Sequence, residues 1–176
     1  MRPSPCRADF RARRALEACE RTLGREHPRT LTSVNNLASL LRAQGKLDEA
    51  EPLCRRALEA RERTLGQEHP DTLISVNNLA LLLRAQGKLD EAEPLHRRAL
   101  EARERTLGRE HPDTLTSVNN LASLLRAQGK LLLRAQGKLD EAEPLCRRAL
   151  EASERTLGQE HPDTLISVNN LALLLR

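Results

Sequence analysis

Residues 69–110 read HPDTLISVNNLALLLRAQGKLDEAEPLHRRALEARERTLGRE, and this stretch decides the fold. Near copies of it begin at His27-Pro28, His111-Pro112 and His161-Pro162. The four His-Pro pairs, counting His69-Pro70, stand 42, 42 and 50 residues apart. Repetition at such a period indicates an array of units that bury a core by stacking on one another.

Each unit reads as two helices. Pro70 suits a first helical position, since its missing N–H needs no partner there, and Gly87 can end the helix in the left-handed conformation. The second helix is expected to open at Asp90, capped by that side chain with Glu93, and to end at Gly108. The apolar residues fall at helical spacing and are expected to be buried: Leu73, Val76, Leu79, Ala80, Leu83, Ala92, Leu95, His96, Ala99 and Leu100.

The repeat boundaries predict six segments with eight helices in an all-α chain. They are a disordered tail (1–7), an orphan second helix (8–24), repeat 1 (27–68), repeat 2 (69–110), repeat 3 (111–160) and a truncated repeat 4 (161–176). Because neither end carries a polar capping helix, we expect a fragment, part of a longer array, or a chain that associates through its ends.

Repeat 3 contains eight extra residues. Its segment 131–138, LLLRAQGK, copies residues 81–88 letter for letter. Eight helical residues add about 12 Å of rise. We therefore expect a lengthened or broken helix near residues 125–138 and a disturbed superhelix there. If the first helix simply continued through Gly129, the following helix would be displaced and Ala142 could not meet Ala122.

Composition excludes several classes of function. The chain has no Trp, no Tyr and one Phe, so it cannot build aromatic platforms for bases or aromatic cages for cations. Its net charge of +4 is low for a nucleic-acid binder, and no apolar run reaches membrane-spanning length. We expect no nucleic-acid and no membrane partner. The cysteines form no Cys-x-x-Cys pair, which fits reduced thiols in a cytoplasmic protein: Cys6, Cys19, Cys54 and Cys146.

Candidate chemical sites have simpler structural interpretations. The four His-Pro histidines lie one repeat apart, too far to share one zinc ion, so they are interpreted as helix-entry residues. Cys54, His96 and Cys146 occupy one equivalent position, interpreted as buried core. The recurring serines lack a recurring Asp/His set. We expect no catalysis, no metal and no cofactor.

The hairpin resembles the tetratricopeptide repeat. The small and large residues of that pattern correspond to Val76, Leu79, Ala80, Leu83, Ala92, His96 and Ala99. The strings EAEPLCRRALEARERTLGQEHPDT (49–72) and NNLA (77–80) are similar to the kinesin light chain variety of the repeat. The resemblance implies a right-handed superhelical solenoid of antiparallel helix hairpins whose inner wall, formed by the first helices, binds extended peptides.

That inner face supplies the candidate binding site. Ile74, Asn78 and Leu81 lie on one continuous stripe of the first helix, and the alternation of Thr32 with Ile74 would make its successive steps polar and apolar. Asn can bond a peptide backbone through both its donor and its acceptor, and Arg suits carboxylates. The stripe therefore predicts a protein or peptide partner of acidic character. The predicted binding residues are Asn35, Asn36, Asn77, Asn78, Asn119, Asn120, Asn169, Asn170, Arg42, Arg84, Arg126 and Arg176.

Two other interpretations are considered. The chain can be a structural spacer or self-associating segment of a larger protein, with no specific ligand on the concave face. An RNA-reading array is disfavoured, because reading one base per repeat needs residues that differ between repeats.

Overall fold

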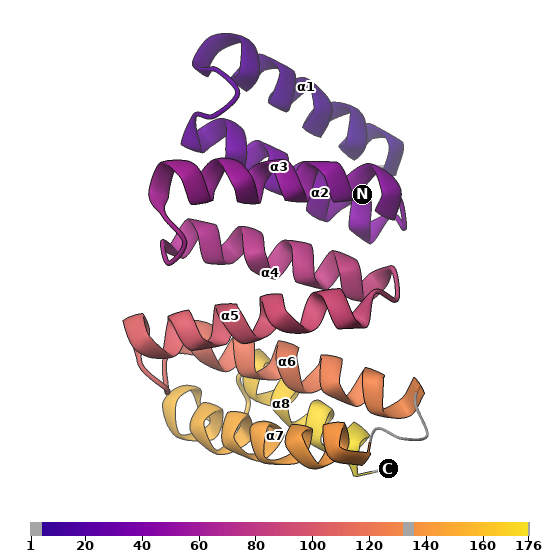
Figure 1. The fold of residues 1–176 in the computed structure, drawn as a ribbon, viewed down its shortest axis with the longest axis vertical. Helices are drawn as coiled ribbons and strands as arrows, with labels where there is room; N and C mark the ends of the chain where they lie inside the picture. The colour runs from indigo at the N-terminus through magenta and orange to yellow at the C-terminus, as the bar shows by residue number, and fades with distance from the viewer. Residues whose placement is uncertain (1–4, 132–135, 176) are drawn as a thin grey trace. The chain divides into compact units, whose positions relative to one another are not determined.

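The computed structural model describes residues 5–131 and 136–175, and within them all regular structure is helical (Figure 1). This confirms the prediction of an all-α repeat fold, with eight helices in the described residues. Their bounds are α1 Pro5–Leu23, α2 Pro28–Ala43, α3 Leu47–Leu65, α4 Pro70–Ala85, α5 Leu89–Leu107, α6 Pro112–Leu131, α7 Gln136–Leu157 and α8 Pro162–Leu174. Helix α1 begins at Pro5, so residues 5–7 of the expected tail are helical.

The helices divide into two compact units, residues 1–88 with α1–α4 and residues 89–176 with α5–α8. In the first unit, α2 packs against α1, α3 and α4, and α3 packs against α4. In the second unit, α6 packs in the same way against α5, α7 and α8, and α7 packs against α8. Each unit therefore sets two first helices of the repeat next to each other, α2 with α4 and α6 with α8.

The His-Pro pairs start the first helices. The Nδ1 atom of His69 accepts a hydrogen bond from the backbone N–H of Asp71 at 3.1 Å, and Pro70 occupies the first turn. The imidazole thus satisfies one of the amides that a helix start leaves without a partner. Equivalent bonds confirm the helix-entry interpretation at His27, His111 and His161.

The expected glycine stop is confirmed, whereas the expected cap of the second helix is wrong. Gly87 has φ 78°, its N–H donates to the Arg84 carbonyl, and the next N–H, of Lys88, donates to the Leu83 carbonyl at 2.9 Å. Helix α5 then begins at Leu89, so Asp90 lies in its first turn. In α3, Lys46 is the N-cap residue and makes no side-chain capping bond. The aspartate favours the helix start through the helix dipole instead.

The predicted apolar positions form the core. Of those in residues 69–110, all are buried except Leu95, which is half-buried. In the second unit, Leu100 of α5 packs with Val118, Leu121 and Leu125 of α6 and with small residues of α7. The close approach of α7 is possible because its contact positions carry alanine, at Ala142 and Ala149.

Two residues at the extra segment of repeat 3 bond the same glutamate. Gln128, before the segment, donates to Glu93 at 3.0 Å, and Lys138, the last residue of the segment, donates to Glu93 at 2.8 Å. Gln86 and Lys88, only two positions apart, contact Glu51 in the same way in the first unit. Helix α6 is four residues longer than α4, as expected. Ala142, which follows the extra segment, is fully buried in the core of the second unit.

Candidate functional site

Two of the predicted binding asparagines are buried, one in each unit, and each joins two neighbouring first helices. Asn35 of α2 is 4% exposed, and its Nδ2 donates to Ser75 Oγ of α4 at 3.0 Å. Asn119 of α6 is 6% exposed, and its Nδ2 donates to Ser167 Oγ of α8 at 2.8 Å. These amides hold α2 to α4 and α6 to α8, and a ligand could use their donors only by breaking those bonds.

The other predicted asparagines lie at the surface. Asn36 and Asn169 are exposed, and the rest are half-buried: Asn77, Asn78, Asn120 and Asn170. Asn170 donates to Asn119 Oδ1 at 3.3 Å, so one surface amide is positioned by a buried one. Exposed Thr32 and Ile74 lie on the same stripe in the first unit, and Thr116 and Ile166 do so in the second. Each unit therefore presents alternating amide, hydroxyl and apolar groups on its paired first helices.

The predicted arginines end this stripe. Arg42, Arg84 and Arg126 are half-buried, and Arg176 lies outside the described residues. Among the described residues, no carboxylate forms an ion pair with Arg42 or Arg126. Their positive charges instead act on the thiols of Cys54 and Cys146.

The cysteine and histidine position of the second helix is part of the core, as predicted. Cys54, His96 and Cys146 are all buried. Burial raises the pKa of the Cys54 thiol to about 11 and also raises the pKa of Cys146, which keeps both thiols protonated and poor nucleophiles. In the part of the chain that the structure describes, no group of three His, Cys, Asp or Glu side chains could hold a metal ion.

Buried arginines are the site residues that the sequence reasoning missed. Arg61 is buried, and its Nη1 donates to the Asp71 carbonyl at 2.8 Å and to Ser75 Oγ at 3.1 Å. Its Nη2 donates to Thr32 Oγ1 at 3.2 Å. Burial lowers the pKa of Arg61 below its ordinary value, although the negative charge of Asp71 acts to raise it. Arg103 makes the equivalent bonds to the Asp113 carbonyl and Ser117 Oγ. The available signal was the variation of this position within the last ten letters of the second helices, which are otherwise identical.

A glutamate near the start of the second helix accepts several hydrogen bonds. Glu51 accepts from Gln86 at 2.8 Å, Lys88 at 2.9 Å and Arg55 at 2.7 Å. These hydrogen bonds lower the pKa of Glu51 to about 2, and the bond from Gln86 has the largest effect. For Glu93, burial acts to raise the pKa, but bonds from Lys138, Gln128 and Arg97 outweigh it and lower the value to about 2. Both carboxylates are structural anchors of the interhelical turns.

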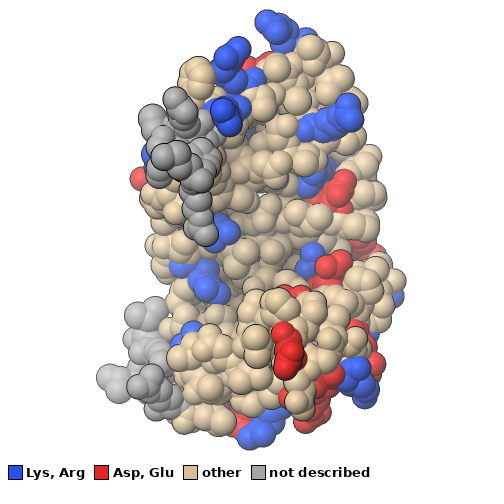
Figure 2. Space-filling view, turned by 180° about the vertical axis from the view of Figure 1, so that it is seen from behind, with Lys and Arg blue, Asp and Glu red and all other residues tan. Residues whose placement is uncertain are grey.

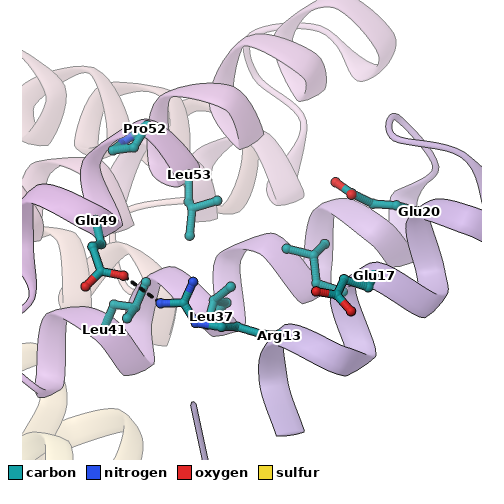
Figure 3. A pocket seen from close by; sticks show the side chains of 9 residues that line it. Arg13, Glu17, Glu20, Leu37, Leu41, Glu49, Pro52 and Leu53 are labelled. Carbon is teal, nitrogen blue, oxygen red and sulfur yellow. Dashed lines mark hydrogen bonds and ion pairs between the residues drawn. The ribbon is translucent and has the colours of Figure 1, made fainter. Parts of the chain in front are cut away.

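A pocket of about 370 Å³ lies elsewhere in the first unit, between α1, α2 and α3 (Figure 3). Leucine side chains of the three helices form much of its lining, and Arg13 Nη2 donates to Glu49 Oε2 at 2.6 Å across it. None of the predicted asparagines or arginines lines this pocket. Besides the leucines and the salt bridge, Glu17, Glu20 and Pro52 line the pocket.

Basic side chains are scattered on the face of the first unit that Figure 2 draws. Lys and Arg lie there in separate groups with uncharged surface between them. The net charge of the chain is only +4, which is low for a protein that binds a phosphate backbone. Among the described residues, no helix has the length and apolar character to cross a membrane.

Comparisons with known proteins match the repeat. A family model described as Tetratricopeptide repeat matches residues 11–51, 29–104 and 74–132, and a second model of the same description matches residues 131–163. No curated protein sequence matches the chain.

Solved structures give the same result. Two crystal structures of a putative kinesin light chain of Podosopora anserina with nearly identical TPR-like repeats, one of them carrying a single substitution, are 30% identical in sequence to this chain. They superpose with TM-scores of 0.78 and 0.77 over 97% of this chain and 76% and 77% of theirs. BtubC (BKLC) from P. vanneervenii is 25% identical, with a TM-score of 0.76 over 98% of this chain and 66% of its own. The chain therefore belongs to the tetratricopeptide repeat family and is similar to its kinesin light chain-like members.

Proposed function

We propose that this protein is a non-catalytic scaffold that binds an extended, acidic peptide segment of a partner protein on the stripe of its first helices. Tetratricopeptide repeats generally mediate protein–protein interactions and are generally non-catalytic. The acidic preference and the stripe itself are our proposal. We also place the protein in the cytoplasm, where its free thiols would stay reduced.

The observation that carries the proposal is the pairing of first helices within each unit. Because Asn35 fixes α2 to α4 and Asn119 fixes α6 to α8, the surface asparagines of neighbouring helices are held in fixed positions. An extended peptide exposes backbone N–H and C=O groups that amide side chains can bond. The apolar contacts would come from Ile74 and Ile166, which are exposed on the same stripe.

The acidic preference rests on the arginines that end the stripe. Arg55, Arg97 and Arg147 of the second helices each pair with a glutamate four residues earlier. Arg42 and Arg126, by contrast, form no ion pair among the described residues. A guanidinium group that has no carboxylate partner in the described part of the chain can bond a carboxylate of the ligand.

Selection from an unbiased display library of ten-residue peptides on the immobilised protein tests this proposal. We expect the enriched peptides to be rich in Asp and Glu. We also expect them to dissociate rapidly, because their affinity would come from many weak contacts with the stripe. The binding of the selected peptides is then measured by fluorescence anisotropy. Enrichment of basic or purely apolar peptides would contradict the acidic preference.

Matched variants locate the binding surface. Replacing Arg42, Arg84 and Arg126 together by Ala is expected to weaken binding at least tenfold, since three charge-assisted contacts of about 0.5–1 kcal/mol each would be lost. The control variant replaces Arg55, Arg97 and Arg147 by Ala, which changes the net charge equally but on the second helices. Equal loss of binding in both triple variants would indicate a general charge effect and would refute the site.

The alternative function, a self-associating segment, is favoured by the apolar surface of α8. Leu165, Val168 and Leu175 are exposed at this helix. The positions equivalent to Val168 in α4 and α6, Val76 and Val118, are completely buried. Light scattering over a range of concentrations separates the two functions, because association through α8 would raise the average mass without any peptide.

A further inference from the structure

One position distinguishes the four second helices, which otherwise end in the same ten letters. The strings are ALEACERTLG (15–24), ALEARERTLG (57–66), ALEARERTLG (99–108) and ALEASERTLG (149–158). The fifth letter alone varies, as Cys19, Arg61, Arg103 and Ser153. Each of these residues stands fourteen positions before a serine of the following first helix, and three of them contact it: Ser33, Ser75 and Ser117.

Arg61 shows what this position binds when it carries a guanidinium group. Its acceptors are Thr32 Oγ1, the Asp71 carbonyl and Ser75 Oγ. Each hydroxyl has a second bond that orients it. Thr32 donates to the Pro28 carbonyl at 3.0 Å, and Ser75 accepts from Asn35 at 3.0 Å. The guanidinium is therefore held by three neutral oxygens.

At Ser153 the guanidinium group is missing and its space is a pocket. The pocket has a volume of about 80 Å³, and Thr116, Asn119, Asn120, Ser153, Asp163 and Ile166 contribute to its lining. Ser153 is completely buried, and its Oγ has no hydrogen-bond partner among the described residues. A buried hydroxyl without a partner is costly, so a polar group in the space beside Ser153 would be favourable.

Counterparts of all three acceptors of Arg61 are present in the second unit, and two of them, Thr116 and Asp163, contribute to the lining of this pocket. Thr116 corresponds to Thr32 and donates to the Pro112 carbonyl at the same 3.0 Å. Ser167 corresponds to Ser75, accepts from Asn119 at 2.8 Å and donates to the Asp163 carbonyl at 3.1 Å. The unit thus keeps an acceptor set for a guanidinium group that its own chain does not supply.

We propose that the pocket at Ser153 binds the guanidinium group of an arginine side chain that a bound peptide supplies. Arginine fits better than lysine, because its planar fork of donors can reach several fixed oxygens at once. Thr116, Asn120 and Ile166 lie both at the pocket and on the first-helix stripe, so a peptide on the stripe can place a side chain into it. The peptide source of the arginine rests on the proposed function, whereas the guanidinium chemistry of the pocket does not.

The chemistry is tested by NMR titration of the full-length ¹⁵N-labelled protein with N-ethylguanidinium, using ethylammonium as a control of equal charge. We expect saturable shifts at Ser153, Ser167 and Thr116 with half-saturation at roughly 1–10 mM for N-ethylguanidinium, since a few hydrogen bonds support only weak affinity. The half-saturation concentration of ethylammonium should be at least tenfold higher. Equal shifts with both cations, or no saturable shift, would overturn the proposal.

Two variants make the test specific. Ser153→Arg places a guanidinium group of the chain itself in the pocket, as Arg61 and Arg103 do, and should fold normally and abolish the shifts. Ser153→Ala keeps the space and the other acceptors, so it should retain binding within about threefold. Unchanged shifts in the Ser153→Arg protein would show that the ion binds elsewhere.

The peptide source is tested separately, with an acidic peptide selected on the protein and carrying one Arg at successive positions. At one position, Arg should bind at least tenfold tighter than Lys or neutral citrulline, and Ser153→Arg should remove that difference. If such peptides bind without any preference for Arg, the pocket proposal fails while the proposed function stands. If N-ethylguanidinium binds but no peptide does, the guanidinium site stands and its peptide source is refuted.

Discussion

At the scale of single residues, two adjacent asparagines have different tasks. Asn35 is buried and bonded to Ser75, while Asn36 is exposed. The sequence motif Asn-Asn predicted both as ligand contacts, because helical spacing alone does not show how near the neighbouring first helix lies. The buried amide became evident only with the packing of α2 against α4.

This difference predicts distinct effects of two alanine substitutions. Asn35→Ala removes a buried hydrogen bond and should lower the free energy of unfolding by about 1–2 kcal/mol. Asn36→Ala should change it by less than about 0.5 kcal/mol, as at other surface positions, but should weaken peptide binding. Urea denaturation followed by circular dichroism measures both stabilities. Equal destabilisation by the two substitutions would contradict the assignment.

Glu51 predicts a specific dependence of stability on acid. Its folded-state pKa of about 2 lies below the ordinary value of 4.5, so the ionised carboxylate stabilises the fold above about pH 4.5. That stabilisation is lost progressively as the pH falls toward 2. The wild-type protein should therefore exceed Glu51→Gln in urea midpoint at pH 7, and the gap should narrow steadily from pH 5 to pH 3.

A second glutamate serves as the control for this measurement. Glu143→Gln removes an exposed i,i+4 pair with Arg147 and should change the midpoint little at any pH. A gap between wild type and Glu51→Gln that stays constant with pH would mean that the lost contacts matter but the charge does not.

At the scale of helices, the start and the end of each element were largely predictable. Proline at the first turn and glycine after the last turn depend on backbone chemistry that the sequence displays directly. The cap at Asp90 was mispredicted because Leu89 already takes helical geometry after the left-handed turn at Gly87. Local motifs compete at such a junction, and the turn that forms there decides which residue becomes the cap.

The extra segment of repeat 3 shows the same limit. The sequence revealed the duplication but not where the added length goes. In the structure, Gln128 before the segment and Lys138 at its end both bond Glu93, and Ala142 after it is buried. These side-chain contacts depend on the folded arrangement and could not be read from the duplication.

Deletion of residues 131–138 restores the ordinary AQGKLDE turn and tests this view. We expect the variant to fold with a free energy of unfolding within about 1 kcal/mol of wild type, because closing a shorter connection differs little in entropy. Circular dichroism and urea denaturation measure the effect. A loss of helix greater than the deleted residues account for would show that the added length is needed for packing.

At the scale of the whole molecule, the repeat period identified the fold class and the family, whereas the candidate site was only partly predictable. The period repeats along the chain, so pattern matching finds it. The Ser153 pocket arises from one substitution whose meaning depends on three oxygens brought together by folding, Thr116, the Asp163 carbonyl and Ser167. A single changed letter does not reveal such a set.

Under the alternative function, the exposed face of α8 mediates weak self-association. Replacing Leu165 and Val168 by Glu should keep the protein monomeric at concentrations where the wild type shows a rising average mass by light scattering. Leu107→Glu, at another exposed leucine, is the matched control and should behave as wild type. A wild-type mass independent of concentration would exclude association through α8 and would leave peptide binding as the function.

The variation at Ser153 also bears on how a ligand is aligned. Because the two first helices of each unit present nearly the same groups, a peptide has more than one equivalent placement, shifted by one repeat, and could slide between them. A pocket that accepts one arginine at one step makes a single placement more favourable than the others. A single residue that differs between otherwise uniform repeats would in this way determine the register in which the partner peptide binds.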